Sequence, residues 1–243
     1  MPENVDPAEA ACLVETYMTA FQTLHFNQSF LTRYRKNSLQ GKTILIIGGM
    51  STNMTRAMSQ LAQLAGAKNI FATARKKDFK QLSEYGIMPL STDPLVWWEQ
   101  LAGSVDLLIS LDEEVIPLHY KLVKIDGTVV VSSSEFHEDL MMYEDTRDPL
   151  QRKFACSSSK SQASSRTAHY DLFEEWGKSP VKGKKDLAHL VDLLDKQKIV
   201  PHILDRVPLS KVAKIQATIE KHRVKGHYVC EPWLISKSRA VSL

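Results

Sequence analysis

The stretch Thr43-Ile44-Leu45-Ile46-Ile47-Gly48-Gly49-Met50-Ser51-Thr52-Asn53-Met54 decides the fold. Its apolar half predicts a buried strand, its glycines predict a tight turn, and a helical pattern follows over residues 55–64. Strand, glycine turn and helix in this order are typical of sites that hold the phosphates of a dinucleotide. Met54 stands where such turns carry a third glycine for close packing of helix and strand, so the turn is degenerate.

The pattern around this stretch alternates short apolar strands with helices of about ten residues. Short buried strands separated by such helices predict a parallel sheet with helices on both faces. Right-handed crossovers then give a doubly wound, Rossmann-like α/β fold. The strands are expected at 43–47, 69–73, 88–90, 105–111 and 128–131, and the helices at 55–64, 77–85, 94–101 and 117–123.

The two ends of the chain depart from this alternation. A helix is expected over residues 7–24, with Asp6 as its N-cap and Pro7 at its first position, and a second amphipathic stretch follows over 28–36. Residues 152–156 are a candidate sixth strand, and a serine-rich piece predicts a mobile surface loop. Beyond it we expect a helix at 186–196, an extended piece at 199–203, a helix at 210–222 and a strand at 227–230.

We therefore divide the chain into four parts. They are leading helices from an interdomain region (1–40), a Rossmann-like core (41–156), a serine-rich loop (157–185) and a C-terminal part of helices and a closing strand (186–243).

Composition excludes several classes of protein. The chain has 243 residues, 43% of them hydrophobic, and a net charge of +3, which is too mild to indicate a nucleic-acid partner. Its apolar runs are too short to predict a membrane span, and its acidic, polar first residues do not predict a secretory leader. Three scattered cysteines predict a reducing compartment, the cytoplasm, and no disulfide framework.

Several short pieces together resemble one family, the medium-chain dehydrogenase/reductase superfamily and in particular its zinc-independent quinone- and enoyl-reductase branch. The likeness covers nearly the whole chain, although no single piece is specific. The pieces are Asp6-Pro7-Ala8-Glu9-Ala10-Ala11, Tyr17-Met18-Thr19-Ala20-Phe21, Gly41-Lys42-Thr43-Ile44-Leu45-Ile46-Ile47-Gly48, Gln63-Leu64-Ala65-Gly66-Ala67, Ala72-Thr73-Ala74, Lys198-Ile199-Val200-Pro201-His202-Ile203 and Pro208-Leu209-Ser210-Lys211-Val212-Ala213.

The resemblance implies an oxidoreductase that transfers hydride between a nicotinamide cofactor and a carbonyl or an activated double bond. It covers only the cofactor-binding half, since the GroES-like catalytic domain that precedes this half in the family has no counterpart here. Zinc-dependent members carry a cysteine ligand at the position of Thr16, with Cys12 one turn earlier. Thr16 is a poor zinc ligand, so we expect no zinc.

The family resemblance and the glycine turn give a set of candidate cofactor residues. Backbone N–H groups of Gly48 and Gly49, with the hydroxyls of Ser51 and Thr52, would hold the pyrophosphate at the helix N-terminus. The alternative is an ordinary strand–helix turn in a protein that has lost its cofactor.

The residues after the second strand indicate which dinucleotide would bind. NAD sites carry an acidic residue there, whereas this chain has Ala74-Arg75-Lys76-Lys77. Three cations match the 2′-phosphate of NADPH, and Arg75 also matches it by its fork geometry. The alternative is a solvated first turn of a helix. An S-adenosylmethionine site also uses a glycine turn, but it usually carries an acidic residue at the end of the second strand, where this chain has Ala74-Arg75.

Further residues bear on the nicotinamide end. Thr19 matches a threonine that lies near the nicotinamide in relatives, and Ser132 follows the fifth strand on that side. Leu111 replaces a small residue that lets the cofactor pass, which counts against full activity. Tyr120 and Lys124 form the Y-x-x-x-K pair of short-chain reductases, but they precede the strand that the pair should follow.

Three interpretations remain open. The chain is an NADPH-binding portion of a reductase that turns over weakly or not at all by itself, a non-catalytic nucleotide-binding or scaffold module of that ancestry, or a fragment of a normal enzyme. An uncovered face on the opening helix and the last strand also predicts a homo-oligomer or a protein partner.

Overall fold

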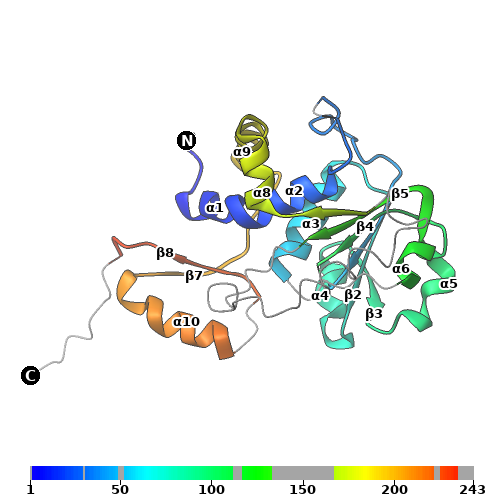
Figure 1. Ribbon diagram of the computed structural model, residues 1–243. Coiled ribbons are helices and arrows are strands. Elements are labelled where there is room, and N and C mark those ends of the chain that lie inside the picture. The colour runs from blue at the N-terminus through cyan, green and yellow to red at the C-terminus, as the bar shows by residue number, and fades with distance from the viewer. Residues whose placement is uncertain are drawn as a thin grey trace, which may run out of the picture.

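The computed structural model describes residues 2–29, 31–48, 52–111, 117–132, 167–221 and 225–234. Its centre is a six-stranded sheet in the order β3-β2-β1-β4-β5-β6, in which every neighbouring pair is parallel (Figure 1). The prediction of a doubly wound parallel sheet is confirmed. The strands are β1 (Thr43–Ile47), β2 (Asn69–Ala74), β3 (Met88–Ser91), β4 (Val105–Ser110), β5 (Val123–Ser132) and β6 (Thr167–Tyr170).

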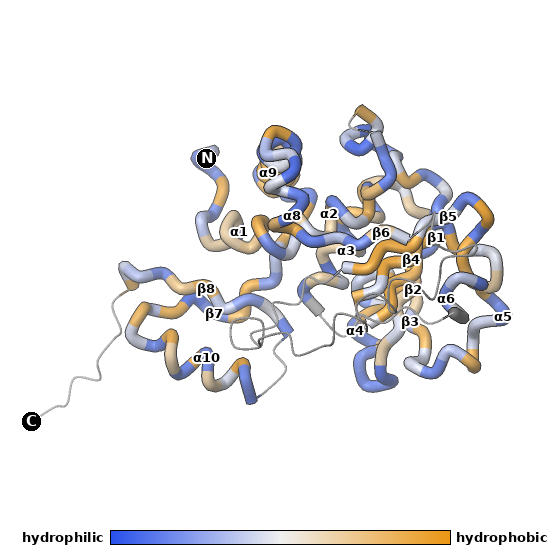
Figure 2. The backbone as a smooth tube through the Cα atoms, viewed as in Figure 1, coloured by the Kyte–Doolittle hydropathy of each residue, from blue (hydrophilic) through white to orange (hydrophobic). Residues whose placement is uncertain are grey.

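Alternate side chains of β1 enter two separate cores, which is why its apolar run is continuous. Ile44 and Ile46 pack into the larger core with the opening helix, whereas Leu45 and Ile47 pack into the smaller core with Trp97. Figure 2 shows the hydrophobic residues concentrated in the central strands. The helices around the sheet are α3 (Thr52–Leu64), α4 (Phe79–Glu84), α5 (Trp98–Leu101), α6 (Pro117–Leu122), α8 (Leu172–Lys178) and α9 (Pro180–Asp195).

The opening helix forms as expected over Pro7–Leu24, in three consecutive parts. These are α1 (Pro7–Cys12), one π-helical turn (Leu13–Tyr17) and α2 (Met18–Leu24). The Asp6 carboxylate accepts a hydrogen bond from the Ala8 N–H at 2.9 Å, which makes it the predicted N-cap.

The second amphipathic stretch, at 28–36, forms turns in its described residues, so the leading part at 1–40 has helix only in its opening segment among the residues described. Among its described residues, successive turns form through bonds such as Arg35 N–H to the Thr32 carbonyl at 3.0 Å. The polar residues of this stretch have partners outside a helix. Arg33, for example, turns inward and is 2% exposed.

Regular structure also resumes earlier than the sequence predicts. The sixth strand is β6, which pairs with the end of β5, and it lies inside the range assigned to the loop at 157–185. Asp171 then caps α8, because its side chain accepts the Glu174 N–H at 2.7 Å. The candidate strand at 152–156 and the serine-rich piece lie outside the described residues.

A small C-terminal unit stands apart from the large sheet and beside α1 (Figure 1). In this unit β7 (Ile203–Val207) pairs in parallel with β8 (His227–Cys230). The helix α10 (Val212–Lys221) lies between the two strands in the sequence. The last strand matches its prediction, whereas β7 begins where the extended piece at 199–203 was expected to end. Arg206 of β7 forms ion pairs with Asp6 and, at 2.9 Å, with Glu231, and so ties this unit to the first helix.

Candidate functional site at the carboxyl edge of the sheet

The carboxyl ends of the parallel strands meet along one edge of the large sheet. In the register, Ile47 lies opposite Ser110, Ser110 opposite Val131, and Ser132 opposite Tyr170. The strand order reverses direction between β1 and β4, and such a switch point is where open α/β sheets bind ligands. The Gly48 turn and Leu111 both lie at this point.

Gly48 has a backbone conformation that glycine adopts readily. Its φ is +77°, a left-handed conformation that favours glycine, and its N–H donates to the Thr73 hydroxyl at 3.1 Å. The bond fixes the start of the turn against the end of β2. Gly49 and Ser51 lie outside the described residues. Thr52 is the first residue of α3, whose N-terminus therefore faces the turn.

Met54 does not enter the turn. It is 6% exposed and belongs to the larger core, with Met18 and Ile46. At the position of the missing third glycine, the side chain therefore packs into the core.

Leu111 lies directly after β4, beside the switch point. It is 9% exposed and packs in the same core, and its N–H donates to the Ile47 carbonyl at 3.0 Å. The bond carries the β1–β4 ladder one residue beyond Ser110. A bulky side chain is thus fixed where the sequence suggested that relatives have a small one.

The end of β2 presents cations to solvent. Ala74 is buried, and Arg75, Lys76 and Lys77 are exposed around the short 3₁₀ turn that follows. Arg75 Nε lies 3.4 Å from an oxygen of Asp78, so only part of its guanidinium is engaged in this contact.

Asp78 and Lys225 form an ion pair beside these cations, and the sequence analysis identified neither residue. Lys225 Nζ bonds Asp78 at 2.9 Å and the Gln81 side-chain oxygen at 2.7 Å. The hydrogen bond from Lys225 is the main cause that holds the pKa of the Asp78 carboxyl below its usual range. Asp78 could have been identified from the sequence as a partner of Arg75, because it lies three residues after it at the start of a helical segment. Lys225 could not, because 147 residues separate it from Asp78.

Tyr170 connects the helix that carries Thr19 to the strand end that carries Ser132. Thr19 and Ser132 are both fully buried, and Ser132 pairs with Tyr170 across β5 and β6. The Tyr170 hydroxyl donates at 2.7 Å to Gln22, which lies one helical turn after Thr19 on α2. The helix that carries Thr19 is therefore docked on the strand end that carries Ser132. No local signal identifies Tyr170, since β6 has no apolar run.

Tyr120 and Lys124 are not brought to this edge. Lys124 lies 3.0 Å from Asp106 near the starts of β4 and β5, at the amino end of the sheet. The Tyr120 hydroxyl accepts a hydrogen bond from the Thr167 hydroxyl at 3.1 Å. The pair has structural partners and lies far from the switch point.

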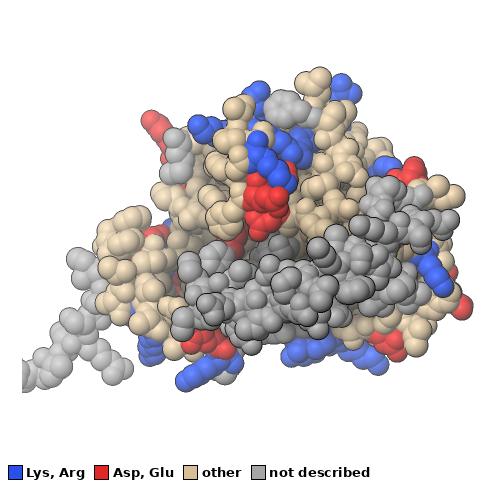
Figure 3. Space-filling view, in the orientation of Figure 1, with Lys and Arg blue, Asp and Glu red and all other residues tan. Residues whose placement is uncertain are grey.

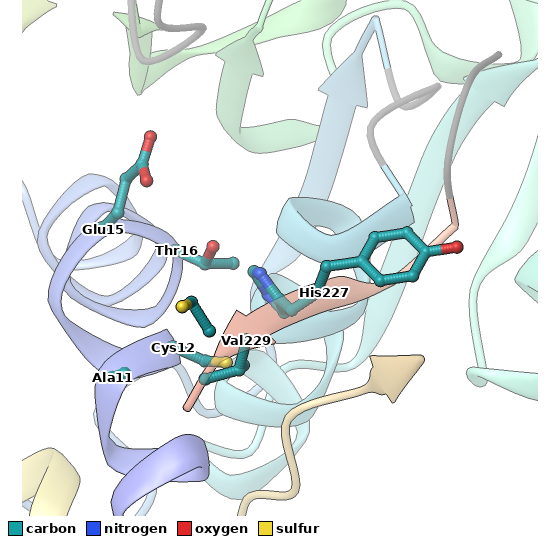
Figure 4. Close-up of a pocket in the computed structure, with 8 residues that line it drawn as sticks. Ala11, Cys12, Glu15, Thr16, His227 and Val229 are labelled. Carbon is teal, nitrogen blue, oxygen red and sulfur yellow. The ribbon is translucent and has the colours of Figure 1, made fainter. Parts of the chain in front are cut away.

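Thr16 and Cys12 line a cavity of about 290 Å³ together with His227 and Cys230 of β8 (Figure 4). Burial raises the pKa of the Cys12 thiol to about 11, and its Sγ donates to the Ala8 carbonyl at 3.3 Å. The Cys12 thiol is therefore engaged with its own helix. No three His, Cys, Asp or Glu side chains of the described residues are grouped to hold a metal.

Two further observations concern possible large partners. Within the described ranges, no helix combines the length and apolar character needed to cross a bilayer. On the face shown in Figure 3, the described Lys and Arg side chains lie in separate groups, and Asp and Glu lie among them.

Solved structures with the same fold are enoyl reductases and alcohol dehydrogenase superfamily proteins. The CurK enoyl reductase aligns with a TM-score of 0.61 at 20% identity, over 91% of this chain and 61% of that one. The JamJ enoyl reductase aligns with a TM-score of 0.67 at 17% identity, over 95% of this chain and 64% of that one. An NAD-dependent alcohol dehydrogenase aligns with a TM-score of 0.60 at 18% identity, over 95% of this chain and 60% of that one.

These comparisons confirm the fold that the sequence resemblance implied. The chain spans about three fifths of the length of these three relatives. No protein-family model matches the sequence. No curated protein matches it either.

Proposed function

We propose that this chain is the NADPH-binding portion of a zinc-independent oxidoreductase that reduces a carbonyl or an activated double bond. The observation that carries the proposal is the pairing of a left-handed Gly48 at the switch point with three exposed cations at the end of β2. Enoyl reductases and an NAD-dependent alcohol dehydrogenase with the same fold support it.

Each part of the edge has a role in this proposal. Gly48 turns the backbone, with its own N–H held by the Thr73 hydroxyl, and the Gly49 N–H, with Ser51 and Thr52 at the start of α3, binds the pyrophosphate. The group that follows β2, which is Ala74, Arg75, Lys76 and Lys77, surrounds the adenosine ribose and binds its 2′-phosphate.

Thr19 and Ser132 line the nicotinamide side. When bound, the cofactor supplies a hydride, and the protein fixes its orientation and excludes water.

The activity of this chain by itself is proposed to be weak or absent. Leu111 stands at the switch point where the family resemblance implies a small residue, and the chain spans only about three fifths of the length of the enoyl reductases with the same fold. The second candidate is a non-catalytic nucleotide-binding or scaffold module of the same ancestry. Nucleotide binding without turnover of enone or quinone substrates would favour it.

A charge reversal at Arg75 tests the choice of cofactor. Arg75→Glu should weaken NADPH binding by about tenfold or more, because one charge-assisted contact to a phosphate is lost and a repulsion is added. NADH affinity should not fall. The measurement is a titration read by the fluorescence of the reduced nicotinamide.

Lys68→Glu is the matched control. Lys68 is exposed at the amino end of the same strand, so the change in net charge is the same and the effect on NADPH should be small. Equal losses in the two variants, or equal affinity of the wild type for NADH and NADPH, would overturn the NADPH assignment.

We further propose that protein covers the C-terminal unit. Its exposed apolar side chains include Trp233 at 69%, Leu209 at 65% and Ile219 at 46% exposed. The cover is the β-rich domain that the family resemblance implies, or, when that domain is absent, a second copy of this chain. The thiols of Cys12 and Cys230 are free, which supports a cytoplasmic setting.

A further inference from the structure

A second cavity of about 420 Å³ lies away from the carboxyl edge. It is bounded by α2, the end of α3 at Leu61 and Leu64, and the end of α9. Because α3 starts at the Gly48 turn and returns to the start of β1, its last turn marks the opposite end of the sheet. The cavity is therefore separate from the proposed dinucleotide site. Its volume lies in the range of small-molecule sites.

Four rings form one wall of this cavity. Phe21 and Tyr34 stack with their centroids 5.9 Å apart, and His189 packs against them at 5.5 and 5.3 Å. The ring centroid of His25 lies 4.5 Å from that of Phe21. Such a wall binds a planar ring by stacking and edge contacts.

The two histidines contribute rings rather than charges at neutral pH. Burial lowers the pKa of His25 to about 4, and it also holds the pKa of His189 below its usual value. Arg33 and Asp186 face His25 and have opposing effects, since Arg33 lowers its pKa and Asp186 raises it, and His189 lowers it further.

The rim of the cavity carries excess positive charge. Arg35, Lys36 and Lys198 are exposed, and none has an ion-pair partner within the described part of the chain. Lys196 is neutralised by Asp192 at 2.7 Å. The C-terminal ends of α3 and α9 offset roughly half a charge each, so a net charge of about +2 remains.

Arg33 supplies a buried donor at the same place. Its side chain is 1% exposed, and it lines the cavity while pairing with Asp186 at 3.0 Å. Its Nε–H has no hydrogen-bond partner in the described structure. A buried donor without an acceptor is costly unless a ligand satisfies it.

We propose that this cavity binds a small planar aromatic anion, a ring that carries a carboxylate or phosphate group, independently of the dinucleotide. The ring packs on the half-buried rings of Tyr34 and His189, which pack in turn on the buried Phe21. The anionic group lies among Lys36, Lys198 and Arg35, which match it in charge.

The test uses 2-naphthoate as the probe and 2-naphthalenemethanol as its neutral counterpart, with ligand-observed NMR or calorimetry on the full chain. Naphthoate should bind saturably at one site, about tenfold more tightly than the alcohol. The double variant Lys36→Glu/Lys198→Glu should lose at least that factor. Lys184→Glu, an exposed position on α9 outside the cavity, should leave the affinity unchanged.

Competition separates this site from the carboxyl edge. Saturating NADPH should leave naphthoate affinity unchanged, and displacement by NADPH would overturn the proposal. Absence of saturable naphthoate binding at millimolar concentration, or equal binding of acid and alcohol, would also overturn it. Because the probe carries no nucleotide, the result stands whether or not NADPH binds.

Discussion

His25 is the residue whose burial gives the clearest pH signature. Its Nδ1–H donates to the Phe21 carbonyl at 2.9 Å, and its Nε2 accepts from the Ser38 hydroxyl at 3.0 Å. Burial lowers its pKa from 6.5 to about 4. Between these values the unfolded chain binds a proton that the folded chain does not, so stability falls as the pH drops through that window.

We predict that His25 alone removes about 3 kcal/mol of unfolding free energy between pH 7 and pH 4. His25→Gln should flatten this part of the curve, as measured by urea unfolding at several pH values. His169→Gln, at an exposed position on β6, should leave the slope as it is. If both variants and the wild type lose stability equally on acidification, His25 is not buried as described.

Single residues also show how far the candidate site could be predicted. Arg75, Lys76 and Lys77 could be placed at the strand end because they directly follow an apolar run. The direction of Met54 could not be predicted, since the sequence does not say whether a side chain enters a turn or a core. Lys225 and Tyr170 depend on long-range contacts that no local pattern records.

At the scale of elements, one carboxylate joins α9 to the opening helix and to the turns that follow it. Asp186 is fully buried and accepts hydrogen bonds from Arg33 at 3.0 Å, Gln22 at 2.7 Å and the Tyr34 hydroxyl at 2.5 Å. Three donors make the burial of this charge tolerable.

We therefore predict that Asp186→Ala destabilises the fold by about 3–5 kcal/mol, because it leaves the Arg33 charge buried without a counterion. Denaturant unfolding provides the measurement. Asp195→Ala, on the exposed end of the same helix, is the control and should cost little. A loss at Asp186 no larger than at Asp195 would show that the buried pair does not hold these elements together.

The helices and strands could be predicted from the sequence where their apolar residues form a clear run or a regular repeat, and they could not be predicted elsewhere. β1 and β4 have nearly continuous apolar runs, and their bounds were close to those observed. β6 reads Thr-Ala-His-Tyr, so only its pairing with β5 makes it a strand. The stretch at 28–36 has a helical pattern of apolar residues, but bonds between its polar residues favour turns.

At the scale of the whole molecule, the exposed apolar residues of the C-terminal unit should cause association. We predict that the isolated chain forms dimers or larger assemblies in sedimentation equilibrium, and that Trp233→Glu shifts it toward monomer. Leu95→Glu changes a residue that is 74% exposed near β3, on the large sheet, and should have no effect. A monomer at all concentrations would contradict self-association through this face.

The central claim is that the Gly48 turn holds a dinucleotide, and a titration with NADPH followed by its fluorescence tests it most directly. Gly41 and Gly48 have φ values of +73° and +77°, so alanine strains both equally, but only Gly48 lies at the switch point. The account predicts saturable binding that Gly41→Ala retains and Gly48→Ala weakens at least about tenfold, about 1.4 kcal/mol, because strain at Gly48 shifts the turn that binds the pyrophosphate. No saturable signal with NADPH or NADH at millimolar concentration, or equal losses in the two variants, would contradict it.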